Sequence, residues 1–190
     1  MPCKCGSSAL RRQPLTMNRT RIVLAVKYAV YALVLLILYV LQTTPGLFAI
    51  RGITPILVVP AAIAIAMHEG ELAGGFYGAL AGLFCDMSGR VLFGFNGLFI
   101  SFFCVVAGLL VIHLMHSNLR NCILFVAGTM LATSSLEFFF GYGIWGHENA
   151  WRIYVFLTLP TVLYTVIVSP LLFLIVRKFH RKAAKIIARD

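Results

Sequence analysis

The sequence predicts an all-α fold: a polytopic membrane helical bundle of about six transmembrane helices with both termini in the cytoplasm. Composition is the first observation, since 61% of the 190 residues are hydrophobic, 12% are charged and the mean hydropathy is +0.93, far more apolar than a soluble domain. Length is the second, because apolar runs of roughly 20 residues recur along the chain and leave no room for another folded domain. The position of the basic residues is the third.

The Lys and Arg residues gather at the two ends of the apolar region. Of the sixteen, six precede or open the first apolar run, six follow the last, and Arg120 lies in a short loop expected inside. Basic residues mark the cytoplasmic side of a membrane protein, beside anionic headgroups. The formal charge of +10 therefore indicates membrane lipid as a partner and no nucleic acid. The basic residues left for the outer side are Arg51, Arg90 and Arg152.

These charges divide the chain into three parts. We predict a basic cytoplasmic leader over 1–21, a six-helix transmembrane domain over 22–176, and a basic cytoplasmic tail over 177–190 that continues as an amphipathic helix on the inner leaflet. The first apolar run is too long for a cleavable signal peptide and has no A-x-A-like site. Met17, which opens MNRTRIVL, is an alternative start to Met1.

The first two predicted spans differ in length. Ile22–Leu41 is long enough to cross the hydrocarbon core of about 30 Å. Ile53–Met67 contains Pro55 and Pro60 and covers only about 22 Å as a helix. It therefore either crosses with kinked and thinned ends or enters part way. The turn His68–Glu71 then brings the chain back on the cytoplasmic side.

The remaining spans differ in the polar residues and prolines that they carry. The third is short, which places Asp86 toward the outer face. The fifth contains Glu137, and the last contains Pro160 and Pro170, each expected to kink the helix. These four spans are predicted at Leu72–Asp86, Phe95–Met115, Asn121–Tyr142 and Ile153–Val176.

Glycines recur every four residues through the third span, and the series ends in a carboxylate. On a helix such residues form one stripe, and small side chains let a second helix approach closely in lipid. Packing is the more common use of such a stripe, and direct contact with a ligand is the other. The members are Gly70, Gly74, Gly78, Gly82 and Asp86.

Two acids, Asp86 and Glu137, lie at membrane depth toward the predicted outer side. An ionisable group there normally faces the bundle interior, a partner or a polar rim. Two interpretations stay open: an ion pair across the bundle with Arg90 or Arg152, or the binding of a partner. The outer loop is flanked by aromatic residues that predict a belt at the outer interface, namely Tyr142, Trp145, Trp151 and Tyr154.

The sequence carries no arrangement typical of catalysis or of a bound cofactor. It has no GxxxxGK[ST] loop, and its glycines are not spaced as GxGxxG. His68 and Glu69 begin a zinc motif that fails because Leu72 occupies the second histidine position. The pairs His113–His116 and Cys3–Cys5 have no further ligands nearby. We therefore predict no catalytic residue, no metal and no cofactor, and we favour binding or scaffolding over catalysis.

The stretch from Pro55 to Leu98 resembles the MreD family of rod shape-determining proteins. That family has a proline in the second span, a glycine-rich third helix ending in GLxxD, a short glycine-containing loop and a G-x-x-(A/G)-L start to the fourth helix. The number of spans and the short loops also match over almost all of the chain from Met17. The corresponding residues are Pro55, Glu69, Gly70, Gly74, Gly78, Gly82, Leu83, Asp86, Gly94, Gly97 and Leu98.

The resemblance implies a multi-pass scaffold in the bacterial inner membrane. In that family the protein binds MreC and through it connects the cytoplasmic MreB filament with peptidoglycan synthesis outside. The wider rod complex contains a RodA-type glycosyltransferase and its penicillin-binding protein. The residues that we predict for helix packing or partner binding are Gly70, Gly74, Gly78, Gly82, Asp86, Gly94, Asn96, Gly97 and Glu137, with Arg90 and Arg152 as ion-pair partners.

A second function stays open, because MreD-like proteins are also similar in fold to the substrate-binding components of energy-coupling-factor vitamin transporters. Such a subunit needs a substrate cavity at the outer ends of its helices, and Asp86, Asn96, Glu137 and Trp145 are candidates to line it. The two functions imply different companions. An MreC-like protein accompanies the first, and a transporter ATPase with a bound vitamin accompanies the second.

Overall fold

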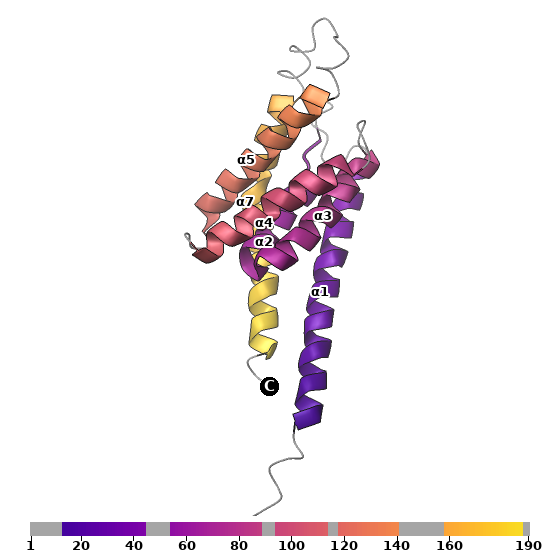
Figure 1. Cartoon of the computed structure of the whole chain (residues 1–190), viewed down its shortest axis with the longest axis vertical. Helices are drawn as coiled ribbons and strands as arrows, with labels where there is room; N and C mark the ends of the chain where they lie inside the picture. The colour runs from indigo at the N-terminus through magenta and orange to yellow at the C-terminus, as the bar shows by residue number, and fades with distance from the viewer. Residues whose placement is uncertain (1–12, 45–53, 89–93, 114–117, 141–157, 188–190) are drawn as a thin grey trace, which may run out of the picture.

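The chain folds as a bundle of helices. The structure, a computed structural model, describes residues 13–44, 54–88, 94–113, 118–140 and 158–187, and all regular structure within those ranges is helical (Figure 1). This confirms the predicted all-α bundle. The helices are α1 (Gln13–Thr43), α2 (Val58–Glu69), α3 (Glu71–Ser88), α4 (Phe95–His113), α5 (Leu119–Phe138) and α7 (Leu159–Ile187).

Four of these helices have the length and composition of membrane spans. Two shorter helices accompany them: α2 has 12 residues and α3 has 18. A helix of 12 residues covers about 18 Å, too little to cross a hydrocarbon core of about 30 Å. The second predicted span is therefore shorter as a helix than its apolar run suggested. The four candidate spans are Leu24–Thr43, Phe95–His113, Leu119–Phe138 and Leu159–Lys182.

Helix α2 begins at Val58, after a non-helical stretch over 54–57. Pro60 is the third residue of the helix. At this position a backbone N–H has no acceptor within the helix, so proline loses no hydrogen bond there. Side chains from other helices satisfy the backbone before it. The Gln42 Oε1 atom accepts hydrogen bonds from the N–H groups of Leu57 at 3.0 Å and Val58 at 3.4 Å. The N–H of Ile56 donates to Thr165 Oγ1 at 3.1 Å. Irregular backbone at membrane depth is tolerated when protein groups satisfy it in this way.

Helix α2 is the centre of the bundle. It packs against each of the other five described helices. Every residue from Val58 to Met67 is buried, so the helix is surrounded by protein rather than by lipid. A helix that is apolar all round and enclosed in this way is a core element.

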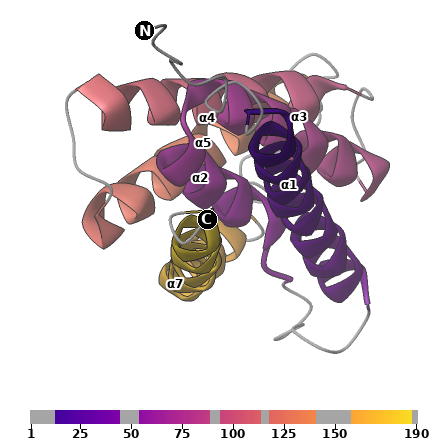
Figure 2. The same ribbon diagram turned by 90° about the horizontal axis from the view of Figure 1, so that it is seen from below.

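The two longest helices, α1 and α7, extend beyond the rest of the bundle in the same direction (Figure 1). The first turns of α1 and the last turns of α7 form these extensions. Figure 2, seen from that side, shows α7 close to end-on and α1 at an angle to it. This arrangement fits the prediction that the two ends of the chain lie on one side of the membrane.

Helix α7 continues through Pro170, a residue that has no N–H to donate to the Val166 carbonyl one turn earlier. The Ser169 hydroxyl donates to that carbonyl oxygen at 2.8 Å. A side-chain donor thus replaces the missing backbone donor, as is common for prolines in membrane helices. The basic tail from Arg177 to Ile187 is consequently part of the same helix as the last span.

Candidate functional site

The glycine stripe of α3 lies against α4 and α2 of the same chain. A Cβ added at Gly78 would lie 2.8 Å from Cys104 Cβ and 2.9 Å from Ser101 Cα, both in α4. A Cβ added at Gly74 would lie 2.6 Å from Cβ of Ala66 in α2. These separations are shorter than van der Waals contact, so only glycine fits at the observed helix spacing. The stripe therefore packs helices within this bundle.

The closest approach is at Gly82. A Cβ added there would overlap the backbone of Asn96 and Gly97 in the first turn of α4. Gly97 itself faces the side chain of Leu83. Gly70 and Gly94 have a different use, because both have φ of +93°, a conformation that favours glycine. They form the turn before α3 and the turn before α4.

Two further glycines extend the seam beyond the predicted stripe. Gly75 of α3 faces Val105 of α4 and has no side chain between the two helices. The Ser101 hydroxyl therefore reaches the Gly75 carbonyl oxygen and donates a hydrogen bond to it at 2.9 Å. Gly108 of α4 lies against the backbone of Gly70 and Glu71. The spacing of four residues pointed to neither glycine, since Gly75 lies beside the stripe and Gly108 is on the opposing helix.

Asp86 caps the start of α4. Its carboxylate accepts hydrogen bonds from three backbone N–H groups, those of Gly94 at 2.9 Å, Asn96 at 3.2 Å and Gly97 at 3.2 Å. The first N–H groups of a helix have no intrahelical acceptor, and the positive end of the helix dipole attracts a negative charge. The last turn of α3 is thereby fixed to the first turn of α4.

Asn96 connects this cap to Glu137 of α5. Its Nδ2 donates to Glu137 Oε1 at 2.5 Å. Asp86, Gly94, Asn96, Gly97 and Glu137 form what we call the Asp86 cluster. Of the polar site residues predicted at this end of the bundle, the structure describes Asp86, Asn96 and Glu137, and it brings all three together.

No Lys or Arg of the described ranges forms an ion pair with Asp86 or Glu137. Arg90 and Arg152, the predicted ion-pair partners, lie outside the described residues, as do Trp145 and the rest of the predicted aromatic belt. Aromatic residues adjoin members of the cluster in the sequence. Phe95 of α4 contacts Phe140, just after α5, with ring centroids 5.2 Å apart.

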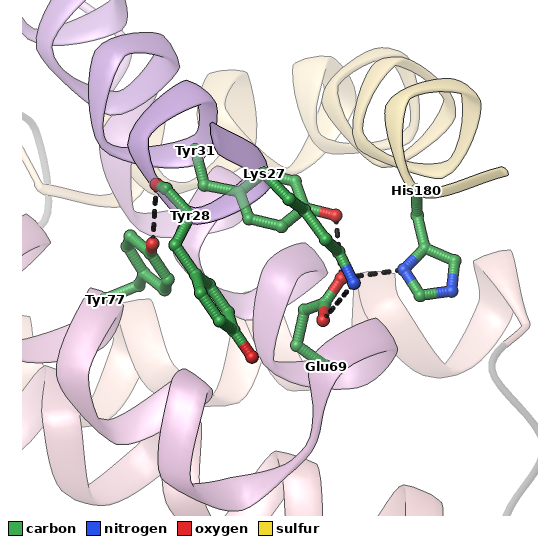
Figure 3. Close-up of polar contacts among 6 residues, drawn as sticks. All are labelled: Lys27, Tyr28, Tyr31, Glu69, Tyr77 and His180. Carbon is green, nitrogen blue, oxygen red and sulfur yellow. Dashed lines mark hydrogen bonds and ion pairs between the residues drawn. The ribbon is translucent and has the colours of Figure 1, made fainter. Parts of the chain in front are cut away.

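A second polar cluster, which the sequence did not reveal, lies at the opposite end of α3. The Glu69 carboxylate accepts hydrogen bonds from Lys27 Nζ at 2.6 Å and from the Tyr31 hydroxyl at 2.8 Å, and it contacts His180 Nδ1 at 2.7 Å. Figure 3 shows Lys27 and Tyr31 of α1 and His180 of α7 pointing at Glu69 at the end of α2. We call these four residues the Glu69 cluster. It connects three helices at one carboxylate.

The Glu69 cluster is largely shielded from solvent, since only 6% of the Glu69 side chain and 11% of the Lys27 side chain are exposed. Burial alone would raise the pKa of the Glu69 carboxyl, but hydrogen bonds from Lys27, Tyr31 and His180 more than offset this and hold that pKa below its ordinary value. Burial, followed by electrostatic interactions with His180 and Arg177, lowers the pKa of His68 to about 4. Glu69 is thus charged and His68 neutral at pH 7.

His68 belongs to this end of the bundle as an aromatic packing residue. Its ring stacks on that of His180, with centroids 5.3 Å apart, and lies 5.1 Å from the ring of Phe173. No group of three or more His, Cys, Asp or Glu residues that could hold a metal occurs in the described parts of the chain. His116, Cys3 and Cys5 lie outside those parts.

An apolar groove opens between α1 and α3 near the Glu69 cluster. It has a volume of about 400 Å³ and is lined by Tyr28, Leu72, Ala73, Phe76 and Tyr77. The Tyr77 hydroxyl donates to the Tyr28 carbonyl oxygen at 2.7 Å, which links α3 to α1 beside the groove. The lining offers few polar groups.

The sequence of this bundle matches the protein-family model described as rod shape-determining protein MreD over residues 23–183. That range runs from the start of the first span to the extension of α7. A search of curated proteins found no match to this chain, and neither did a search of solved structures.

Proposed function

The chain belongs to the MreD family of rod shape-determining proteins, and we propose that it is a membrane scaffold of the bacterial rod complex that binds an MreC-type partner. The chain is an integral membrane protein, and its described residues include four helices long and apolar enough to cross a bilayer. The family is one of shape-determining proteins rather than a known enzyme family. We infer a structural role with no chemistry of its own.

The observation that carries this proposal is the extent of the family match. It covers residues 23–183, so it includes α2 to α5 in full and most of α1 and α7. The polar groups of the bundle support the same role, because they are bonded to other helices. Asp86 and Gln42 accept hydrogen bonds from backbone N–H groups just before a helix begins. Glu69 is bonded to side chains of two neighbouring helices. Such contacts stabilise one arrangement of helices and suit a protein that presents a fixed surface.

In the proposed assembly the partner is a protein with one membrane helix and an outer domain, of the MreC type. Through it the chain helps to couple cytoplasmic MreB filaments to peptidoglycan synthesis by a RodA-type glycosyltransferase and its penicillin-binding protein. The membrane is the bacterial inner membrane. The extensions of α1 and α7 are on its cytoplasmic side, where basic residues are favoured, and the Asp86 cluster is toward the other side.

The proposal is tested by depleting the protein in the rod-shaped bacterium that encodes it. We expect cells to lose their rod shape as the protein is diluted, and the wild-type gene to restore it. We also expect an MreC-like protein to co-purify with the chain from gently solubilised membranes. Cells that remain rods after depletion, together with a preparation that contains no MreC-like protein, would contradict the proposal.

The same preparation separates this function from vitamin transport. A vitamin-binding subunit retains its substrate through gentle purification and is stabilised by it. We expect no bound vitamin and no shift in unfolding temperature across a panel of vitamins. A bound vitamin would support the transporter function instead.

A further inference from the structure

The Asp86 cluster contains a carboxylate that forms no ion pair with any residue in the described ranges. Asp86 is bonded to three backbone N–H groups at a helix start. Among the described residues, Glu137 receives one hydrogen bond, from the neutral amide of Asn96. Within the described part of the chain no Lys, Arg or His forms an ion pair with it. An acid at membrane depth is costly and normally faces a partner charge or a polar path.

The Glu69 cluster shows how this chain compensates a carboxylate when it does so internally. Glu69 has a Lys, a His and a Tyr hydroxyl within 2.8 Å. Glu137 lies in the last turn of a candidate span, as Glu69 lies in the last turn of α2. The two acids are therefore similar in placement and differ in the charges that face them.

A second observation concerns Asn96. This residue is only 5% exposed, and its Oδ1 atom has no hydrogen-bond partner in the described ranges. The Nδ2 atom of the same carboxamide is the one bonded to Glu137, so the unsatisfied oxygen lies next to the Glu137 carboxylate. A buried acceptor without a donor costs about 1–3 kcal/mol. Two acceptors at one place fit a ligand with several N–H donors and a positive charge.

We propose that Glu137 and the Asn96 carboxamide bind a basic side chain, Lys or Arg, from the membrane helix of the partner protein. This inference rests on the proposed scaffold function. An ammonium group has three donors and a guanidinium group five, enough to satisfy the Glu137 carboxylate and Asn96 Oδ1 together. A buried charge-assisted hydrogen bond of this kind fixes the register of two helices.

The surroundings of Glu137 suit a cationic partner that approaches along the membrane. Phe139 and Phe140 follow it and are 62% and 38% exposed. Phe95 contacts Phe140 at the start of α4. Aromatic faces attract Lys and Arg cations, and the exposed rings offer apolar surface to the helix that carries the cation. Glu137 is half-buried, so it is reachable at the bundle surface.

The test uses the purified full chain and its MreC-type partner in nanodiscs made from phosphatidylglycerol and phosphatidylcholine. Glu137→Gln removes the charge and keeps an acceptor for Asn96 Nδ2, and Glu71→Gln is the matched control in a different region. We expect Glu137→Gln to raise the Kd at least about tenfold, as expected for a lost buried ion pair, and Glu71→Gln to bind like wild type. We further expect a charge swap to restore binding: Glu137→Lys should bind a partner in which the Lys or Arg that faces Glu137 is changed to Glu.

The outcomes distinguish the two proposals. If the wild-type chain does not bind the partner, the scaffold function itself is wrong. If the wild type binds and Glu137→Gln binds equally well, only the cation site is wrong. If added phosphatidylethanolamine raises the unfolding temperature of the wild-type chain without its partner, and does not do so for Glu137→Gln, the cation belongs to a lipid headgroup and the inference is overturned.

An ion pair within the chain is tested without the partner. The Asn96 hydrogen bond survives in Glu137→Gln, so we expect the isolated variant to unfold at the wild-type temperature or above. A fall in unfolding temperature equal to that of Arg90→Gln or Arg152→Gln would place the counter-ion in this chain. That result would overturn the inference.

Discussion

Asp86 shows how one side chain can join two helices. The sequence suggested an ion pair or a partner contact for it, whereas its carboxylate in the structure accepts three backbone N–H groups of the turn and helix that follow. The first of these donors is only eight residues further along the chain. The signal was therefore local: an acid at the end of one helix, a glycine turn, and the start of another helix.

We predict that Asp86→Ala destabilises the bundle by about 2 kcal/mol, because it leaves three N–H groups at a helix start without an acceptor. Asp86→Asn should destabilise less, since it keeps one acceptor oxygen but turns an NH₂ group toward N–H donors. Thermal unfolding of the detergent-solubilised protein measures both. An unchanged unfolding temperature for Asp86→Ala would contradict the capping role.

Glu69 is the other residue on which several helices depend. Replacing it by Gln leaves Lys27 buried without its counter-charge, and breaking a buried ion pair in this way costs about 3–5 kcal/mol. We expect Glu69→Gln to lower the unfolding temperature clearly and Glu71→Gln, two residues away, to leave it close to wild type. Equal effects of the two substitutions would show that the Glu69 cluster does not stabilise the fold.

The same residue predicts a pH dependence. The pKa of Glu69 is lower in the folded chain than its ordinary value, so the unfolded chain binds the proton more tightly. The stabilisation is fully present above the ordinary pKa of about 4.3 and is lost as the pH falls through the lower folded pKa. Wild type should lose more stability than Glu69→Gln on acidification below that ordinary pKa. Parallel losses in the two proteins would contradict the prediction.

At the scale of the helices, the seam between α3 and α4 is the most extensive contact in the bundle. It was predictable because its signal is local, a glycine at every fourth position of one helix. The matching surface on α4 has a helical period too, because Gly97, Ser101, Cys104 and Gly108 follow one another at intervals of four, three and four residues, but this spacing does not say which helix the surface meets. The match became visible only when the two helices were placed together.

Substitutions in the seam should be far more harmful than the loss of a glycine elsewhere. Gly82→Ala places a methyl group against the backbone of α4, which cannot move aside as a side chain can, and overpacking of this kind costs about 1–3 kcal/mol or more. Gly128→Ala in α5 is the control, because no atom lies within 4 Å of its added Cβ and Ala is the better helix former. A Gly82→Ala variant as stable as Gly128→Ala would mean that the seam is not closely packed.

Helix α2 was the element least well predicted. Its apolar run begins at Ile53, but the helix begins at Val58. The N–H of Ile56 finds its acceptor in Thr165, 109 residues away, and that of Leu57 in Gln42 of the preceding helix, 15 residues away. Hydrophobicity predicts that such a segment is buried. It does not predict which side chains of other helices accept the hydrogen bonds just before the helix begins.

At the scale of the whole molecule, the fold class followed from hydropathy and charge alone, because the membrane imposes helices and the basic ends orient them. The two polar clusters did not follow in the same way. The partners of Glu69 are up to 111 residues away along the chain, and a single acid in a turn gives no indication of them. Lys27 was counted as an orienting charge, although it is one half of a buried pair.

The clusters lie at opposite ends of α3, one holding α1, α2 and α7 together and the other holding α3, α4 and α5. The bundle is thus fixed at both ends and closely packed between them. We infer that this fixed bundle is what an MreC-type partner recognises, with the Asp86 cluster on the outer side as the contact that sets its register.

The central claim, that the chain is a scaffold for such a partner, is tested most directly by native mass spectrometry of the purified chain and partner released from nanodiscs. The account predicts a discrete complex of the two proteins, with no small molecule bound, that forms with wild type and Gly128→Ala. A chain that stays separate from the partner under the same conditions and carries a bound vitamin would contradict it.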